Sequence, residues 1–340
     1  MSGPLTLPST IRVLERGWLS SNNILLCGAN GIAVVDTGYT THAAQTLSLI
    51  QHTLNGQRLD LIVNTHLHSD HCGGNALLRQ HYRCDIAIPH AEADKVSNWD
   101  EAGLGFRATG QCCERFDFQR TLRPGQTLEL ADLMWEVLAA PGHQPHALML
   151  YCRTERILIT ADALWENGFG VIFPELFGES GFAEQQAVLE LIASLDVDIV
   201  IPGHGAPFTD VAGALERAFS RLAYLRSDPR RNASNALKVL IVFKLLEARS
   251  MTRDDLEAFI DSSSIVQSCL LRLDAPRTKV LKDMLAALQR GGTLRIVKDA
   301  VKDTVKDAVK DAVKDAVKDA VKDAVKDAAE DEAWERIEAC

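Results

Sequence analysis

The chain is 340 residues long, carries a net charge of −10 and is 46% hydrophobic, which is enough length for two domains and enough apolar content for a buried core. The acidic balance argues against a broad nucleic-acid footprint, because phosphate binding usually requires a basic face. No apolar run is long enough to span a bilayer, and the first ten residues lack the basic and apolar regions of a signal peptide. We therefore expect a cytoplasmic protein that acts on a small-molecule substrate, with no membrane or nucleic-acid partner and with its oligomeric state open.

The first part of the chain predicts a series of buried strands that end at chemically reactive side chains. The run from Gly31 to Gly38 is typical of a buried strand followed by a turn. The run from Leu59 to His66 is apolar and β-branched, and three later runs end in the same way at His143, Asp162 and His204. Loops at strand ends are where an α/β scaffold carries its functional residues, so we expect these side chains to meet in one site.

The cluster HxHxDH in "NTHLHSDH" predicts a metal site. Side chains two residues apart in an extended segment point the same way, so His66 and His68 can bind one cation together. Asp70 and His71 follow at a turn and can face a second cation. Crowding these groups together without a cation would be costly, whereas imidazole and carboxylate are the ligands expected for zinc, with manganese or iron as alternatives. The candidate ligands for two divalent metal ions are His66, His68, Asp70, His71, His143, Asp162 and His204.

The order of these motifs, HxHxDH, then PGH, then a strand that ends in aspartate, then PGHG, resembles the metallo-β-lactamase superfamily. The resemblance implies an α/β fold for residues 1–210, a four-layer αβ/βα sandwich with a dinuclear site along one edge. Asp36 matches the strand-end aspartate of that family and is expected to support the ligand loop rather than to bind metal. The roles implied for the ligands are a first metal held by His66, His68 and His143, a second held by Asp70, His71 and His204, and a bridge formed by Asp162.

The eight cysteines have no spacing typical of a disulfide framework or a zinc ribbon, and we expect reduced thiols. Cys72 directly follows a candidate ligand and is interpreted as a packing residue. The neighbouring pair Cys112 and Cys113 has no function that the sequence indicates.

After residue 210 the pattern changes to amphipathic helices. One of them is predicted to begin at Thr252 as N-cap, with Asp255 as its capping-box partner, and the last is predicted to end at Gly291. "TLRIV" follows as a possible short strand. Residues 211–296 are therefore expected to form a C-terminal helical subdomain, which either resembles the winged-helix appendage of some members of the superfamily or is a plain helical cover for one side of the site.

Residues 297–340 are expected to form a low-complexity tail. Val297 to Ala328 is a run of eight tetrapeptides of the Val-Lys-Asp-Ala type, and each repeat of four residues advances the valine stripe by about 40° around a helix axis. Since no single face can then stay buried, we expect an exposed, partly helical segment that adds little to the core. The alternative is that the end of the chain docks on the helical subdomain, through Trp334 and Ile337, or drives oligomerisation.

The ligand set predicts hydrolysis. Two metal ions can lower the pKa of a shared water, polarise a carbonyl and stabilise the resulting oxyanion, so the expected nucleophile is a metal-bridging hydroxide, with Asp70 as the catalytic residue that orients it or moves its proton. The segment from Asp162 to Gly170 resembles that of glyoxalase II-type thioesterases, with an aromatic residue, Trp165, three positions after the aspartate. Trp165 is the candidate for substrate binding.

These residues together predict a zinc-dependent hydrolase of a thioester or ester. A lactonase of the quorum-quenching type is an alternative, but such enzymes usually carry a tyrosine at the position of Trp165. An RNA or phosphodiester nuclease is a second alternative, which the acidic net charge disfavours. A β-lactamase is a weaker prediction still, because the class that shares HxHxDH is exported and lacks the aspartate that corresponds to Asp162.

Overall fold

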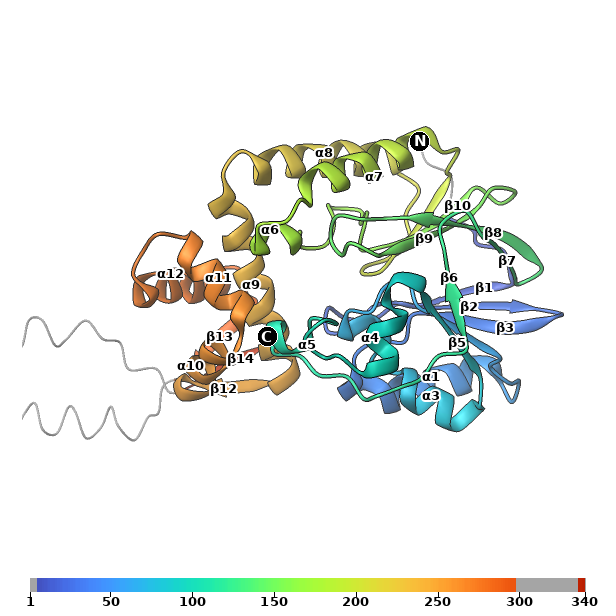
Figure 1. Ribbon diagram of the computed structural model, residues 1–340, viewed down its shortest axis with the longest axis horizontal. Coiled ribbons are helices and arrows are strands. Elements are labelled where there is room, and N and C mark those ends of the chain that lie inside the picture. Colours follow the sequence, from blue (N-terminus) through green and yellow to red (C-terminus); the bar gives the residue numbers. More distant parts are fainter. Residues whose placement is uncertain (1–4, 298–335, 340) are drawn as a thin grey trace, which may run out of the picture.

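The computed structural model describes residues 5–297 and 336–339 of the chain. Figure 1 shows two β-sheets packed face to face, with helices on the outer side of each sheet and a further group of helices at one end. The predicted four-layer αβ/βα sandwich is therefore confirmed.

The first sheet contains six strands in chain order, β1-β2-β3-β4-β5-β6. The first three pair antiparallel, and β3 to β6 pair parallel. Parallel strands are buried on both faces and read as apolar runs, which explains why β3 and β4 could be recognised from sequence. The strands are β1 (Ile11–Leu14), β2 (Asn23–Gly28), β3 (Gly31–Val35), β4 (Leu61–Val63), β5 (Asp85–Pro89) and β6 (Arg120–Leu122), and the helices packed outside them are α1 (Ala43–Leu54) and α3 (Asn75–Tyr82).

The second sheet has the order β11-β10-β9-β8-β7, with one parallel pair, β10 and β11. Its outer face is covered by two helices that pack on each other. One of them, α8, was expected to begin the C-terminal subdomain, but its apolar face lies in the core of the sandwich. The elements are β7 (Thr127–Leu130), β8 (Leu133–Ala139), β9 (Leu148–Cys152), β10 (Ile157–Ala161), β11 (Ile199–Pro202), α7 (Phe182–Ser194) and α8 (Val211–Arg226).

Apolar side chains from the facing sides of the two sheets fill the space between them. Leu26 and Val35 of the first sheet and Trp135 and Leu150 of the second belong to one buried cluster. Short helices occupy the loops around the edge of the sandwich, and none of the helices within the described ranges is long and apolar enough to cross a membrane. These short helices are η1 (Thr40–His42), α2 (Ser69–Cys72), η2 (His90–Glu92), α4 (Ala93–Asn98), α5 (Phe106–Thr109) and α6 (Pro174–Phe177).

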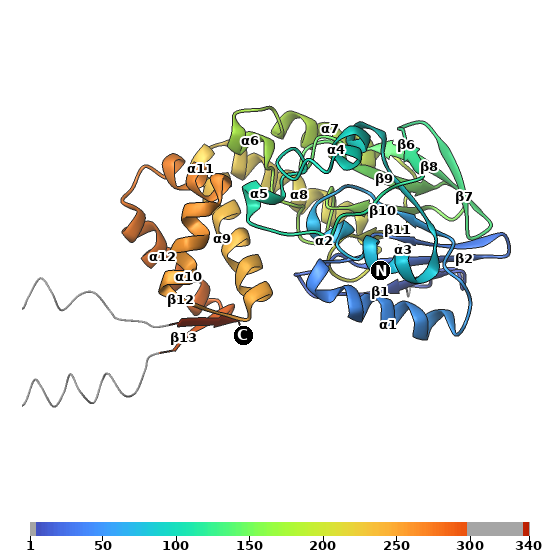
Figure 2. The same ribbon diagram turned by 60° about the horizontal axis from the view of Figure 1, so that its bottom comes forward.

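The C-terminal subdomain stands at one end of the sandwich, and its first helix, α9, lies between the two parts (Figures 1 and 2). Asp228 caps α9 by accepting from the backbone N–H of Arg230. The predicted capping box is present, since Thr252 Oγ1 accepts from the N–H of Asp255 and Asp255 Oδ2 accepts from the N–H of Thr252. The elements are α9 (Pro229–Ala248), β12 (Ser250–Thr252), α10 (Arg253–Ser262), α11 (Ser264–Arg272), α12 (Arg277–Arg290), β13 (Leu294–Val297) and β14 (Arg336–Ala339).

The prediction that the segment after residue 296 adds little to the core is wrong for residues 336–339. These residues form β14, which lies between β12 and β13 as the central strand of an antiparallel sheet. Ile337 is 0% exposed and belongs to the core of the subdomain. For this residue the alternative prediction, that the chain end docks on the helical subdomain, is therefore confirmed. Trp334 and nearly all of the Val-Lys-Asp-Ala array lie outside the described residues. The subdomain therefore contains a three-stranded sheet beside its helices.

Candidate metal centre

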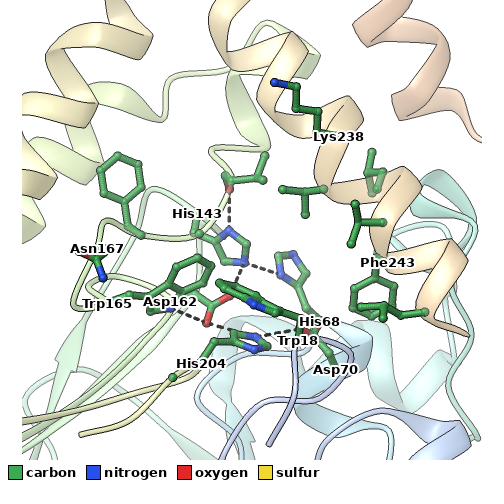
Figure 3. Close-up of a pocket in the computed structure, with 18 of the residues that line it drawn as sticks. Trp18, His68, Asp70, His143, Asp162, Trp165, Asn167, His204, Lys238 and Phe243 are labelled. Atoms are coloured by element: carbon green, nitrogen blue, oxygen red, sulfur yellow. Dashed lines mark hydrogen bonds and ion pairs between the residues drawn. The ribbon is translucent and has the colours of Figure 1, made fainter. Parts of the chain in front are cut away.

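The seven candidate ligands lie together at one edge of the sandwich, where the strands of both sheets end. His66 follows β4, His68 is the N-cap of α2, and Asp70 and His71 lie within α2. From the second sheet, His143 follows β8, while Asp162 and His204 follow β10 and β11. The structure therefore brings every one of them into a single site, part of which is shown in Figure 3.

Three histidines form the first group. The Nε2 atom of His66 lies 3.2 Å from Nδ1 of His68, which in turn lies 2.7 Å from Nε2 of His143. The Nδ1 atom of His143 donates to the carbonyl oxygen of Val171 at 2.6 Å. With its proton on Nδ1, His143 directs the lone pair of Nε2 into the group. Three imidazole nitrogens thus converge on one point, as ligands of a single cation would.

The second group consists of Asp70, His71 and His204. The Nε2 atom of His204 lies 3.2 Å from Oδ2 of Asp70. His71 donates from Nδ1 to Oδ2 of Asp36 at 2.8 Å, which directs its Nε2 towards the other ligands. This Nε2 is fully buried and has no hydrogen-bond partner among the described residues. A buried imidazole nitrogen that has no hydrogen-bond partner and faces carboxylates is placed as a ligand of a cation would be.

Asp162 lies between the two groups. Its Oδ1 atom is 3.4 Å from Nε2 of His71, and its Oδ2 atom is 3.3 Å from Nε2 of His143. Each carboxylate oxygen therefore faces a different group. The indole of Trp165 fixes the position of this carboxylate, because its Nε1 donates to Oδ1 at 3.3 Å.

Burial and charge set the ionisation of these groups in favour of cation binding. Burial lowers the pKa of His66 and His143, and burial together with the nearby His143 lowers the pKa of His68 to about 3. Burial alone would raise the pKa of Asp162, but the His71 and His204 rings outweigh it and the pKa is lowered well below its usual range. The site therefore combines the neutral imidazoles of His66, His68 and His143 with the ionised carboxylate of Asp162, a donor set that suits divalent metal ions.

His71 differs from the other histidines because carboxylates surround it. Burial opposes its protonation, yet Asp162, Asp36 and Asp70 together raise its pKa well above the usual value. A cation bound at Nε2 would take the place of this proton, since a metal ligand must be deprotonated. The three carboxylates and the unpartnered nitrogen thus fit a divalent metal ion at this position.

Asp36 contacts the ligand loop, in the way that the family resemblance implies. It follows β3 with a left-handed backbone conformation, φ 56°, and accepts hydrogen bonds from Thr65 N at 2.9 Å and Thr65 Oγ1 at 2.7 Å besides the one from His71. Strained backbone of this kind persists where the surroundings fix a functional side chain. Asp36 thereby orients His71 and anchors the segment that carries His66.

Replacing Asp36 by asparagine is expected to lower the affinity for metal by about 10- to 100-fold, because the negative charge that orients a metal-binding imidazole would be lost. A titration against a chromophoric chelator measures this without any assay of activity. The matched control is Asp85→Asn, which removes the charge of a partly exposed carboxylate paired with Arg120 at 2.8 Å. Equal metal affinity in the two variants would show that Asp36 has no such role.

A cavity of about 540 Å³ opens next to the ligands, a size typical of small-molecule sites. Figure 3 shows the ligands His68, Asp70, His143, Asp162 and His204 on one side and α9, with Phe243, on the other. Trp165 lines the cavity, as its predicted role in substrate binding requires.

Several cavity residues were not predicted from the sequence. Trp18 lies in the loop between β1 and β2 and stacks on His204, with ring centroids 5.5 Å apart and planes 12° apart. Val242 and Phe243 of α9 and two basic residues, Arg221 and Lys238, also line the cavity. The helical spacing of apolar residues in α9 was visible in the sequence. This spacing does not distinguish a helix face in a closed core from one that lines a cavity.

Comparisons with known proteins agree with this geometry. A family model described as the metallo-beta-lactamase superfamily matches residues 16–204. The structure of a metallo-beta-lactamase family protein from Thermus thermophilus covers 86% of this chain and 97% of its own, with a TM-score of 0.54 and 21% sequence identity. At this level of identity the similarity concerns the fold.

Curated relatives cover the sandwich at low identity. A probable metallo-hydrolase of Methanocaldococcus jannaschii is 27% identical over 55% of this chain and 88% of its own length. A hydroxyacylglutathione hydrolase of Rhodopseudomonas palustris is 30% identical over 35% of this chain and 39% of its own. An acyl-coenzyme A thioesterase of Gallus gallus is 27% identical over 44% of this chain and 57% of its own. The chain therefore spans less than two thirds of the latter two relatives.

Proposed function

The chain belongs to the metallo-beta-lactamase superfamily, and on this basis we propose that it is a zinc-dependent hydrolase of small acyl thioesters or esters. The observation that carries the proposal is the position of the cavity, between the ligand cluster and the apolar face of α9. An acyl group that lies along α9 has its carbonyl carbon beside the ligands. Two relatives named for thioester hydrolysis add support.

The proposed ligand roles follow the two groups and the residue between them. His66, His68 and His143 would hold one ion, Asp70, His71 and His204 the other, and Asp162 would contact both. We propose zinc because mixed imidazole and carboxylate donors suit it, with manganese or iron as alternatives. When bound, such ions supply Lewis acidity towards a carbonyl and lower the pKa of a water molecule.

The residues of the chain itself would position the substrate and move a proton. Asp70 lines the cavity, so its carboxylate can accept a proton from the attacking water and return it to the leaving thiol or alcohol. Trp165 holds Asp162 in place and, with Trp18, whose ring lies 5.3 Å away, shields the flank of the site near His204. Val242 and Phe243 orient the acyl chain.

The alternatives fit the cavity less well. Lactonases of the quorum-quenching type usually carry a tyrosine at the position of Trp165, and an indole cannot supply the phenol of that tyrosine. A nuclease requires a basic face for the phosphate backbone, whereas the chain carries a net charge of −10. The part of α9 near the ligands, with Val242 and Phe243, is apolar, and these side chains offer no hydrogen bonds to a sugar or base.

A turnover screen of the zinc-loaded protein tests this proposal. We expect kcat/KM for at least one short- or medium-chain acyl thioester or ester to exceed that for nitrocefin by about tenfold or more, a difference of one good contact in the transition state. The activity should disappear on chelation and return with zinc. Lactones, a phosphodiester and RNA complete the panel. Faster turnover of nitrocefin, a carbapenem or RNA than of every thioester and ester would refute the assignment.

A further inference from the structure

The cavity has a second charged region, away from the ligand cluster. Arg221 of α8 and Lys238 of α9 both line the cavity. The Nη2 atom of Arg221 donates to Oδ1 of Asn235 at 3.1 Å, and Asn235 lies on the same face of α9 as Lys238, three residues before it. Both cations therefore flank the same turn of α9. Figure 3 shows Lys238 at the opposite end of the cavity from Asp70 and His204.

Arg221 is a largely buried cation that lacks an acidic partner. Neither Arg221 nor Lys238 forms an ion pair with any residue in the described part of the chain. The Nε atom of Arg221 is buried and has no hydrogen-bond partner there, and burial lowers the pKa of its guanidinium. Removing a cation from water without a counter-charge is costly. A ligand that brings a negative charge would offset this cost.

The surrounding chain holds Arg221 in place. Its guanidinium lies over the ring of Phe169, 5.7 Å from the centroid. Its Cδ passes so close to Gly168 that a β-carbon at that position would lie 2.8 Å away, and Gly168 has φ 123°, a conformation that favours glycine. Gly168 O accepts a hydrogen bond from Trp165 N at 2.7 Å. The turn that positions Trp165 therefore also leaves room for Arg221.

We propose that Arg221 and Lys238 form an anion-binding subsite. It binds a carboxylate or phosphate group at the end of the substrate remote from the bond that is hydrolysed. The planar guanidinium matches the two oxygens of such a group, and Lys238 adds a second charge. Among the residues that the structure describes, Glu166 is the one acidic residue in the cavity lining besides the proposed metal ligands Asp70 and Asp162, so the two cations exceed it by one positive charge. The substrate class is then an amphipathic anion, with an apolar segment along α9.

This inference rests on the proposed function, but anion binding can be measured without hydrolysis. The test therefore uses ligands that cannot be hydrolysed. Isothermal titration of the zinc-loaded full-length protein compares the thioether S-octyl-3-mercaptopropionate with its neutral methyl ester. We expect the carboxylate to bind about tenfold or more tightly, the effect of a charge-assisted hydrogen bond. A third ligand, S-octyl-2-mercaptoethyl phosphate, shows whether phosphate is preferred to carboxylate.

Substitutions then locate the preference. Arg221→Gln and Lys238→Met should each reduce the ratio of the two affinities several-fold, whereas a purely structural role would weaken both ligands and leave the ratio unchanged. Arg226→Gln is the matched control, because Arg226 lies on the same helix, donates to Gln186 at 2.8 Å and is exposed. Equal affinity for both thioethers, binding of neither, or an unchanged ratio in both cavity variants would overturn the proposal. Charge-dependent binding without turnover of any thioester or ester would instead refute the proposed function alone.

Discussion

Replacement of Asp162 by alanine is expected to remove nearly all hydrolytic activity and at least one of the two metal ions. Its two oxygens face His71 in one ligand group and His143 in the other, at 3.4 and 3.3 Å, so the variant would lose a ligand shared by both positions. The loss in kcat/KM should exceed about 100-fold, because even a residue that only orients a metal ligand contributes about 10- to 100-fold. The carboxylate would also no longer offset the close approach of the imidazoles.

Elemental analysis of carefully purified protein should give close to two metal ions per chain before the substitution and one or fewer after it. Asp198→Ala is the matched control, since it makes the same exchange at an exposed carboxylate, which pairs with Arg156 at 2.9 Å. An exposed pair of this kind contributes little, so both metal content and turnover should be kept. Full activity of Asp162→Ala, or one metal ion per chain in metal-replete wild-type protein, would contradict a dinuclear site.

The ligand positions were predictable because they depend on short-range patterns, whereas the four-layer sandwich was implied by the order of the motifs and its resemblance to a known family. Strands that are buried on both faces appear as apolar runs, and each run that ends at His66, His143, Asp162 or His204 places a polar group where the edge of the sandwich must be. The spacing within HxHxDH then determines which side chains point the same way. The structure brings together the seven residues that these local rules select.

The cavity was not predictable because it depends on contacts between distant segments. Trp18 stacks on His204, which is far from it in the sequence, and no local pattern predicts this contact. Arg221 lies in the run "RLAYLRS", which is typical of a solvated helix end, yet its guanidinium is largely buried beside Phe169. A periodic apolar face on α9 predicts burial, but not that Phe243 borders a cavity instead of a closed core.

Strand β14 was missed for a related reason. Its four residues are separated from β13 by nearly all of the Val-Lys-Asp-Ala array. The repetitive composition of the array obscures the pattern of a short strand at the chain end. In the structure, Val297 and Arg336 are direct partners in the antiparallel register of β13 and β14. The array is thus inserted at the position of a hairpin loop. Loop length has a modest effect on stability, so a fold can accept such an insertion where it could not accept loss of the strand behind it.

Two variants separate the contribution of the array from that of β14. Ending the chain at Val297 removes the array and β14, which leaves β12 and β13 without a common partner and takes Ile337 out of the core. Loss of one buried isoleucine side chain costs about 2–5 kcal/mol, and lost strand pairing adds to this. Replacing residues 298–335 by Asn-Gly, a two-residue hairpin loop, removes the array but keeps β14.

The first deletion is expected to lower the thermal midpoint by at least about 5 °C and to expose the subdomain to limited proteolysis. Turnover should fall with it, because β14 packs on α9 and α9 supplies the apolar wall of the cavity. The Asn-Gly variant should keep a midpoint and a kcat/KM close to those of the full chain. Ile337→Asp, which leaves the length of the chain unchanged, should behave like the first deletion, since it buries a carboxylate without a partner. If all three variants matched the full chain, β14 would have no part in stabilising α9, and if the Asn-Gly variant alone lost activity, the array itself would be required.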